Sequence, residues 1–321
     1  MIIAASLLGA VLINNRLQPL LPAHANHFTL NVTDVDNPRL GPYYLDEDGK
    51  VGNVSIDPHG IPVVHYGNDV HYNAVTVSQY ALELFHQYLQ LQNAGTRNRF
   101  LKQARWLRDF CVRGKCIFRF SHPPEIYSRV WISGMAQSQF ISVQLRAYQL
   151  TKDKNFLLAA NSAFGYLVKP IRDGGTLDQT AGATWFEEYP QVPSTHVLNG
   201  HMFALFGLWD YYRVTRSALA RSLFLDGQRT AVDGLRLSDT GFWGRYDLAH
   251  AGLCTSSYLS LEIAQLRVLK IVTKSSSADT LITAFSHYTR SARSYVLLLI
   301  YNLEHPKQGY EKALPCPMRV A

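Results

Sequence analysis

The chain has 321 residues, of which 47% are hydrophobic and 17% charged, a composition typical of a folded protein with a substantial core. Lysine and arginine number 31 against 24 acidic residues, and the resulting net charge of +7 favours a polyanionic partner. The positive residues are dispersed along the chain and no nucleic-acid signature is found. An acidic glycan is therefore favoured over DNA or RNA.

The N-terminus has some features of a secretion signal. Residues 2–13 form an apolar run, and Ala23-His24-Ala25 has the small-x-small pattern of a signal-peptidase site. No lysine or arginine precedes the run, so export and a cytoplasmic location both stay open. The run is too short to span a bilayer, as is every later apolar stretch, and we expect no integral membrane segment.

The cysteines do not indicate a metal site. The four residues lack the paired spacing and neighbouring histidines of a zinc centre, and no nucleotide loop or other cofactor motif is found. We therefore expect neither metal nor cofactor. Cys111 and Cys116 are close enough in sequence to meet across a tight hairpin, although free thiols are the alternative.

The predicted elements divide the chain into two regions. Residues 1–66 are predicted to be an N-terminal extension with a few short strands, because the part from residue 28 is rich in Asn, Asp, Pro and Gly. Over residues 67–321, apolar side chains recur every three or four residues, as in helices. This period predicts helices at residues 77–91, 100–111, 136–150, 156–167, 202–212, 218–235, 261–271 and 281–299.

Three short extended hairpins are expected between helices, at residues 115–121, 176–189 and 240–248. Amphipathic helices that pair and bury one face each are expected to close into an α/α barrel, or toroid, whose end loops line a cleft. A helical solenoid would have a similar pattern, but no fixed-period repeat is found. The fold class predicted is mainly α, an α/α barrel of helical hairpins.

The first candidate site residues are two adjacent acids, Glu187 and Glu188, within the aromatic segment Trp185–Pro190. Burial of a carboxylate beside aromatic rings raises its pKa and makes it a usable general base near neutral pH. A solvated acid pair before a proline turn is an equally good interpretation. Asn199 follows shortly, in Val197-Leu198-Asn199-Gly200.

Tyrosines form the second group. Tyr246 precedes Asp247, and His250 and Tyr258 follow. A phenol can exchange a proton where nearby groups stabilise its anion, so two tyrosines could serve as acid and base. With 18 tyrosines in the chain, packing is the commoner role.

Two further segments could bind sugar. Trp131 opens a helix that carries Gln137 and Gln139, whose side-chain amides could bind sugar hydroxyls. The same helix carries Arg146, which could contact the substrate, although a structural ion pair is an equally good interpretation.

Tyr72 and Asn73 precede the first helix, where an aromatic face could stack on a pyranose ring. Helix capping explains Asn73 equally well.

Taken together, these segments resemble the C-terminal catalytic domain of the heparan-type D-glucuronyl C5-epimerase family. The matching stretches run in one colinear order from about residue 66 to residue 271. The most specific are Glu187-Glu188-Tyr189-Pro190 and Val197-Leu198-Asn199-Gly200.

The resemblance implies an α/α-barrel enzyme, an isomerase without cofactor, that converts D-glucuronate to L-iduronate in an acidic polysaccharide, and it implies a homodimer. The catalytic set that it implies is Glu188, Tyr189, Tyr246 and Tyr258. Expected substrate contacts are Tyr72, Asn73, Trp131, Gln137, Gln139, Arg146, Glu187, Asn199 and His250.

This sequence departs from the family at Ala249, where a basic residue commonly follows Tyr-Asp-Leu, and the loop from Tyr246 to Tyr258 is shorter than in animal members. Two other functions stay open. The same C5 carbanion could expel the C4 substituent, which would make the protein a uronate lyase. A glycan-binding module without catalysis would use a similar aromatic cleft.

Overall fold

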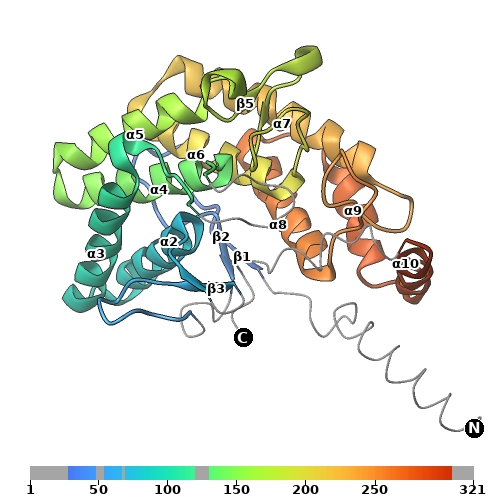
Figure 1. Ribbon diagram of the computed structural model, residues 1–321, viewed down its shortest axis with the longest axis horizontal. Coiled ribbons are helices and arrows are strands. Elements are labelled where there is room, and N and C mark those ends of the chain that lie inside the picture. The colour runs from blue at the N-terminus through green and yellow to red at the C-terminus, as the bar shows by residue number, and fades with distance from the viewer. Residues whose placement is uncertain (1–27, 48–53, 67–68, 120–129, 306–321) are drawn as a thin grey trace, which may run out of the picture.

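The computed structural model describes residues 28–47, 54–66, 69–119 and 130–305 (Figure 1). The apolar run at residues 2–13 and the signal-like triplet lie outside these ranges. Within them, every helix falls short of the length or the apolar character that a membrane crossing requires.

The described chain is mainly helical, which confirms the predicted class. The α-helices are α2 (Ala74–Leu91), α3 (Ala94–Phe110), α4 (Gly134–Thr151), α5 (Lys154–Leu167), α6 (Leu198–Thr215), α7 (Ala218–Ser238), α8 (Ser256–Thr273), α9 (Asp279–Tyr288) and α10 (Ala292–Glu304). Short 3-10 turns are η4 (Val112–Gly114), η5 (Ile171–Asp173) and η6 (Thr180–Gly182). The strands are β1 (Phe28–Leu30), β2 (Leu45–Glu47), β3 (Val64–Tyr66), β4 (Asp69–His71), β5 (Leu177–Asp178) and β6 (Trp185–Phe186), paired in sequence as three antiparallel two-stranded sheets.

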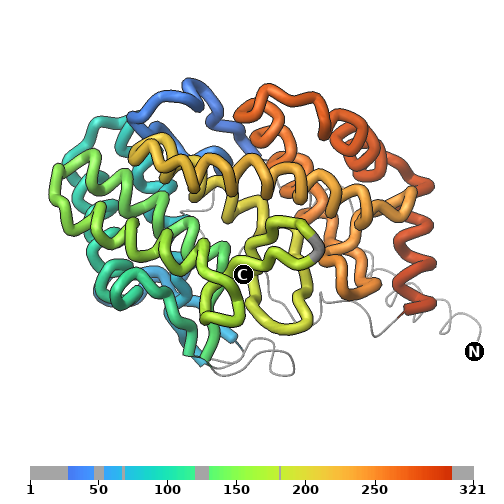
Figure 2. Tube along the Cα trace, turned by 90° about the horizontal axis from the view of Figure 1, so that it is seen from above, coloured from blue at the N-terminus to red at the C-terminus, as the bar shows by residue number. Residues whose placement is uncertain are grey.

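The helices pack in hairpins, α2 with α3, α4 with α5, α6 with α7 and α8 with α9 (Figures 1 and 2). An inner row is formed by α2, α4, α6 and α8, each in contact with the next. Turns within a pair are short and connections between pairs are long. The inner helices therefore run in the same direction, and the long loops gather at the end where those helices begin.

Local sequence explains the short turns. Each inner helix ends at a residue with positive φ, which turns the chain sharply; these residues are Gln92, Lys152, Arg216 and Lys274. The outer helices α3, α5 and α7 begin at once after side-chain caps from Asn93, Asp153 and Ser217. Polar residues at these positions thus fix the direction of each hairpin.

The segment before α2 packs into the helical array. The hydroxyl of Tyr44 donates a hydrogen bond to Asp210 of α6 at 2.8 Å, and Arg146 of α4 forms an ion pair with the same carboxylate at 2.6 Å. All three side chains are buried. The sheet of β1 and β2 also contacts α8. The domain boundary at residue 66 stays a prediction.

The structure corrects the helix predicted at residues 281–299, which is two helices. The first helix, α9, ends at Tyr288. Ser291 then caps the start of α10 by accepting a hydrogen bond from the amide of Ser294. The predicted hairpin at 176–189 is confirmed by the pairing of Leu177 with Phe186.

At 240–248 the described residues form isolated bridges rather than paired strands. The stretch 115–121 lies partly outside the described ranges, and its Phe118 forms one bridge with Trp131. Cys111 and Cys116 form a disulfide, as the short spacing suggested.

Candidate functional site

Three long loops meet at the first turn of α6. The amide of Gly134, at the start of α4, donates to the carbonyl of Glu187 at 2.8 Å. The amide of Leu198 donates to the carbonyl of Tyr246 at 3.4 Å, and the side chain of Gln265 donates to the carbonyl of Asn199 at 3.0 Å. The loops that carry the predicted catalytic residues are therefore neighbours around one helix end.

Glu188 points toward α6 and has little contact with solvent, with 7% of its surface exposed. A Cβ added to Gly200 would lie only 2.3 Å from Glu188 Oε2, so glycine is required for this close approach. Oε2 has no hydrogen-bond partner among the described residues. Burial, assisted by the charge of Glu187, raises the pKa of Glu188 to about 7, although a hydrogen bond with Tyr189 opposes the rise.

A neutral histidine fixes the strand before Glu188. The amide of Phe186 donates to Nδ1 of His201 at 3.0 Å, so Nε2 carries the proton and donates to the carbonyl of Gly227 at 2.9 Å. Burial lowers the pKa of His201 to about 4, which keeps the ring uncharged. The ring also stacks on Trp185, with centroids 4.3 Å apart. Strand β6 is thereby held from both α6 and α7.

Glu187 holds the loop that follows Glu188. Its buried carboxylate accepts hydrogen bonds from the amide of His196 at 3.1 Å and from Nδ1 of His196 at 2.5 Å. Burial acts to lower the pKa of His196, but the hydrogen bond and charge of Glu187, with the charge of Asp178, raise it overall. The acid pair is therefore not solvated, and Glu187 has a structural partner.

The candidate tyrosines lie in two aromatic contacts. The rings of Tyr246 and Tyr258 meet edge to face with centroids 5.2 Å apart. The ring of Tyr189 lies 5.4 Å from that of Trp131. Tyr189 and Tyr246 are buried and Tyr258 is half-buried. The loop-end site is defined here as these four residues together with Glu188.

Other expected substrate contacts lie at the same end of the helices. Asn199 is in the first turn of α6, and its buried Oδ1 has no hydrogen-bond partner among the described residues. Asn73 caps α2 by accepting from the amide of Val75 at 2.8 Å, as the capping interpretation predicted. Tyr72 is exposed and donates to Asp57 at 2.7 Å. His250 is exposed and contacts Asp247 at 3.0 Å.

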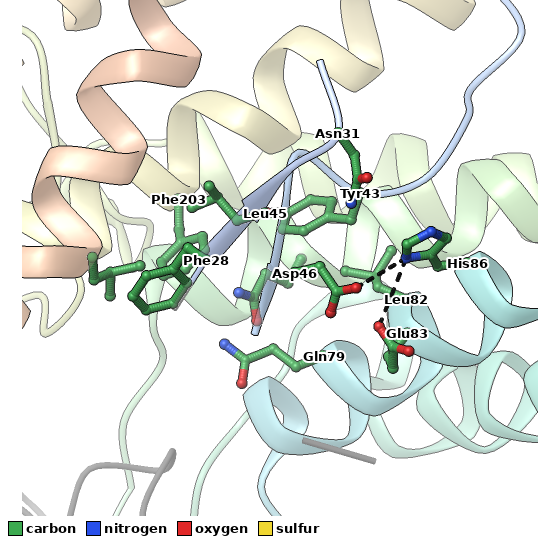
Figure 3. Close-up of a pocket in the computed structure, with 12 residues that line it drawn as sticks. Phe28, Asn31, Tyr43, Leu45, Asp46, Gln79, Leu82, Glu83, His86 and Phe203 are labelled. Atoms are coloured by element: carbon green, nitrogen blue, oxygen red, sulfur yellow. Dashed lines mark hydrogen bonds and ion pairs between the residues drawn. The ribbon is translucent and has the colours of Figure 1, made fainter. Parts of the chain in front are cut away.

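Three expected substrate contacts lie in the interior instead. Gln137 is fully buried and is bonded to the backbone at Cys116 and Gly114. Arg146 is fully buried in its ion pair with Asp210, which agrees with the structural alternative. Gln139 is also fully buried, and it lines a pocket between the inner helices (Figure 3). These side chains face the core because α4 is buried along its length and not only on one stripe.

Sequence reasoning missed the two histidines. His196 lies 9 residues from Glu187, whose carboxylate it contacts, and His201 lies 15 residues from Phe186, whose backbone amide it accepts from. No helical or strand period joins such positions, so the sequence carries no signal for these contacts. Gly200 was noted only as part of a motif, and the close approach of Glu188 explains why a glycine stands there.

Comparison with known proteins places this site within a described family. Residues 112–287 match the family model described as D-glucuronyl C5-epimerase C-terminus. The D-glucuronyl C5-epimerase of Caenorhabditis elegans is 34% identical over 142 residues, which is 40% of this chain and 23% of that protein. An uncharacterized protein of Methanocaldococcus jannaschii is 24% identical over 271 residues, 77% of this chain and 82% of that protein. The chain thus spans less than a quarter of the length of the worm protein.

Proposed function

Since the chain belongs to the D-glucuronyl C5-epimerase C-terminal family, we propose that it inverts C5 of uronate residues in an acidic polysaccharide. The substrate we propose is a heparosan-like or heparan-like glycan, in which D-glucuronate becomes L-iduronate. Because so little of the worm protein's length is covered, both its activity and its substrate come to this chain as part of the proposal.

The observation that carries the proposal is the buried carboxyl of Glu188, with its pKa raised to about 7. A general base works best when its pKa lies near the working pH, because it is then both available and strong enough. The C5 hydrogen beside a carboxylate is poorly acidic, so removal of that proton needs such a base in a site shielded from water.

Inversion also needs a proton donor on the opposite face of the sugar. We assign this role to the half-buried Tyr258, in ring contact with Tyr246. Tyr246 and Tyr189 would orient the sugar or hydrogen-bond its carboxylate as negative charge builds up there. One proton leaves C5 and one returns, and no electron is gained or lost. Side chains alone balance this reaction.

The helix directions support an anionic substrate. All four inner helices begin at the end where the loop-end site lies. Helix N-termini carry partial positive charge and stabilise nearby anions. A uronate carboxylate therefore finds a favourable field there, although Ala249 stands where the family commonly has a basic residue.

The test is to incubate the protein with heparosan and follow two products. New iduronate signals in the NMR spectrum without ultraviolet absorbance from an unsaturated uronate support epimerisation. Absorbance from an unsaturated product would instead assign a lyase. Binding of the polymer without either product would assign a glycan-binding module and refute the proposal.

The homodimer implied by the family resemblance also stays a proposal. Light scattering coupled to size-exclusion chromatography should give twice the chain mass of 36.2 kDa. A single chain mass at micromolar concentration would refute the dimer without bearing on the chemistry of the loop-end site.

A further inference from the structure

Residues 97–119 carry the whole net charge of the protein. They hold eight of the 31 lysines and arginines but only one of the 24 acidic residues, Asp109. The rest of the chain therefore holds 23 of each and is formally neutral. This segment, which consists of most of α3 and the residues that follow it, is an exception to the otherwise dispersed positive charge.

The outer face of α3, at the left edge of Figure 1, presents three of these cations to solvent. Arg99, Lys102 and Arg105 are exposed and three residues apart in turn, so they are neighbours on one face of the helix. In the part of the chain that the structure describes, neither Lys102 nor Arg105 forms an ion pair, and Asp109 pairs with Arg108 at 3.8 Å instead. Like charges this close destabilise a helix. These side chains therefore cost stability unless an anion from outside balances them.

An aromatic row runs beside the three cations. Trp106 and Phe110 follow Lys102 at intervals of four residues, so the three side chains lie along one row of the helix. The rings of Trp106 and Phe110 stack with centroids 4.8 Å apart, and the ring of Tyr72 lies 5.0 Å from that of Trp106. Tyr72 is 39% exposed. The α3 surface is defined here as these three aromatic residues together with Arg99, Lys102 and Arg105.

Two members of the α3 surface are held in place by the protein. The hydroxyl of Tyr72 donates to Asp57 at 2.7 Å, and the same carboxylate accepts from the amide of Ile61 at 2.8 Å. The guanidinium of Arg99 donates to the hydroxyl of Tyr80 at 2.5 Å, which positions the cation without neutralising it. A binding surface that is ordered in advance loses less conformational entropy when its ligand binds.

Cations beside aromatic rings suit a linear anionic sugar polymer. The carboxylates of such a polymer pair with the cations, and the C–H bonds on one face of a pyranose ring pack on an aromatic face. At 1.5 Å per residue, Arg99 and Arg105 lie about 9 Å apart along the axis of α3. Charges spread over this distance favour an extended polyanion over a small anion, because several anionic groups are needed to meet them all.

The α3 surface leads to the loop-end site. Since α3 follows α2 after a short turn and packs against it as a hairpin, its last residues lie at the end where the inner helices begin. The disulfide between Cys111 and Cys116 ties the end of α3 to the next segment. In that segment Phe118 stacks on Trp131 of the loop-end site, with centroids 4.2 Å apart. One polymer could therefore contact both places.

We propose that the α3 surface is a second binding site for the acidic polysaccharide, which holds the polymer while one of its uronates occupies the loop-end site. The class of ligand rests on the proposed function. Binding at a second place on the same chain raises the effective concentration of uronate at the first. The family match begins at residue 112, so α3 lies outside the matched part of the chain.

Binding of heparosan by surface variants tests the proposal. Heparosan is immobilised on a sensor and each protein is added in solution, without following turnover. The double variant Lys102→Gln with Arg105→Gln should bind about fivefold more weakly than the parent. Arg290→Gln with Arg293→Gln removes two exposed cations beside α10, at the opposite edge of Figure 1, and should bind as the parent does. Because all four side chains are exposed, both double variants should keep the thermal midpoint of the parent.

Tyr72 tests the aromatic part of the surface. Tyr72→Leu removes the ring and Tyr72→Phe keeps it, while both lose the hydrogen bond to Asp57. Tyr72→Leu should bind heparosan about threefold more weakly than the parent, and Tyr72→Phe should bind as the parent does. Equal binding by Tyr72→Leu and Tyr72→Phe would show that no sugar ring packs there.

Three further results would overturn the proposal. The first is the absence of binding by the parent, and the second is equal affinity of all four charge and parent forms, or equal weakening in the two double variants. The third is displacement from heparosan by single-stranded DNA at lower concentration than by soluble heparosan, which would assign the surface to nucleic acid. A parent that forms iduronate but fails these tests would keep the proposed function and lose only the second site.

Discussion

Replacing Glu188 by glutamine should change how the stability of the protein depends on pH. The carboxyl has a pKa of about 7 in the folded protein, against an ordinary value of 4.5. A group whose pKa rises on folding stabilises the fold while it is protonated, and this contribution is lost as the pH rises from 4.5 to about 7. Glutamine resembles the protonated carboxyl and does not titrate, so the variant avoids the loss.

The expected magnitude follows from the two pKa values. A tenfold change in an equilibrium constant is about 1.4 kcal/mol. Ionising Glu188 in the folded protein therefore costs about 1 kcal/mol at pH 5 and about 3 kcal/mol at pH 8. Relative to the parent, the free energy of unfolding of Glu188→Gln should rise by about 2.5 kcal/mol between these two pH values.

Urea unfolding of both proteins at pH 5 and pH 8 measures this difference. The parent alone is not informative, because His201 titrates in the same range with the opposite effect. Its pKa falls to about 4 on burial, so it contributes stability that is lost as the pH falls below 6.5. The buried Glu262, whose pKa burial raises, adds a loss of the same sign as that of Glu188. Both contributions cancel in the comparison of variant with parent.

Glu304→Gln, an exposed site at the end of α10, is the matched control and should show no such change. If the stability difference between Glu188→Gln and the parent is the same at both pH values, the carboxyl is not perturbed by burial. The argument for Glu188 as a base near neutral pH would then fail.

Three further predictions concern stability and the position of Glu188. Arg146→Met should lower the free energy of unfolding by about 3 to 5 kcal/mol, because it removes the closer of the two arginines paired with the buried Asp210 and leaves only Arg213, at 3.6 Å; a urea midpoint equal to that of the parent would contradict this. Gly200→Ala should lower stability by about 1 to 3 kcal/mol and displace the Glu188 carboxyl, seen as a lower rate of C5 exchange; unchanged rate and stability would show that the site tolerates the methyl group. His201→Ala should cost about 2 to 4 kcal/mol in urea unfolding, because it removes buried volume and leaves the β6 amide without its acceptor.

Much of the fold could be predicted from the sequence because it depends on local patterns. Apolar spacing located the ends of helices α2 to α8 to within six residues. It failed at 281–299, where the apolar period continues through Thr289 and only the Ser291 cap divides α9 from α10. The spacing of apolar residues alone does not reveal a helix boundary when the apolar pattern continues across the capping residue.

The candidate site could be predicted only where its residues adjoin in sequence. Trp185 and Phe186 beside the acids correctly suggested a buried carboxylate, and Glu188 is buried. On α4, Arg146 was offered both a substrate and a structural role, and only the remote Asp210 decides between them. When a helix is buried on all sides, the spacing of its polar residues does not show which of them pack in the core and which face the site.

The contact between Asp46 and His86 illustrates the same limit. Glu83 and His86 have the spacing of one helical turn, which is visible in the sequence. Asp46 lies 40 residues before His86, and only the packing of β2 against α2 brings them together. The sequence therefore carries no sign of this contact, which depends on the tertiary structure.

Hydrogen exchange at C5 tests the central role of Glu188 most directly. Heparosan is incubated in deuterated water with the parent, with Glu188→Gln and with Glu304→Gln, and deuterium at C5 of the uronate residues is measured by NMR. Deuterium should enter with the parent and with Glu304→Gln, and should be lost with Glu188→Gln while that variant remains folded. Exchange at the parent rate in Glu188→Gln would show that another group removes the C5 proton.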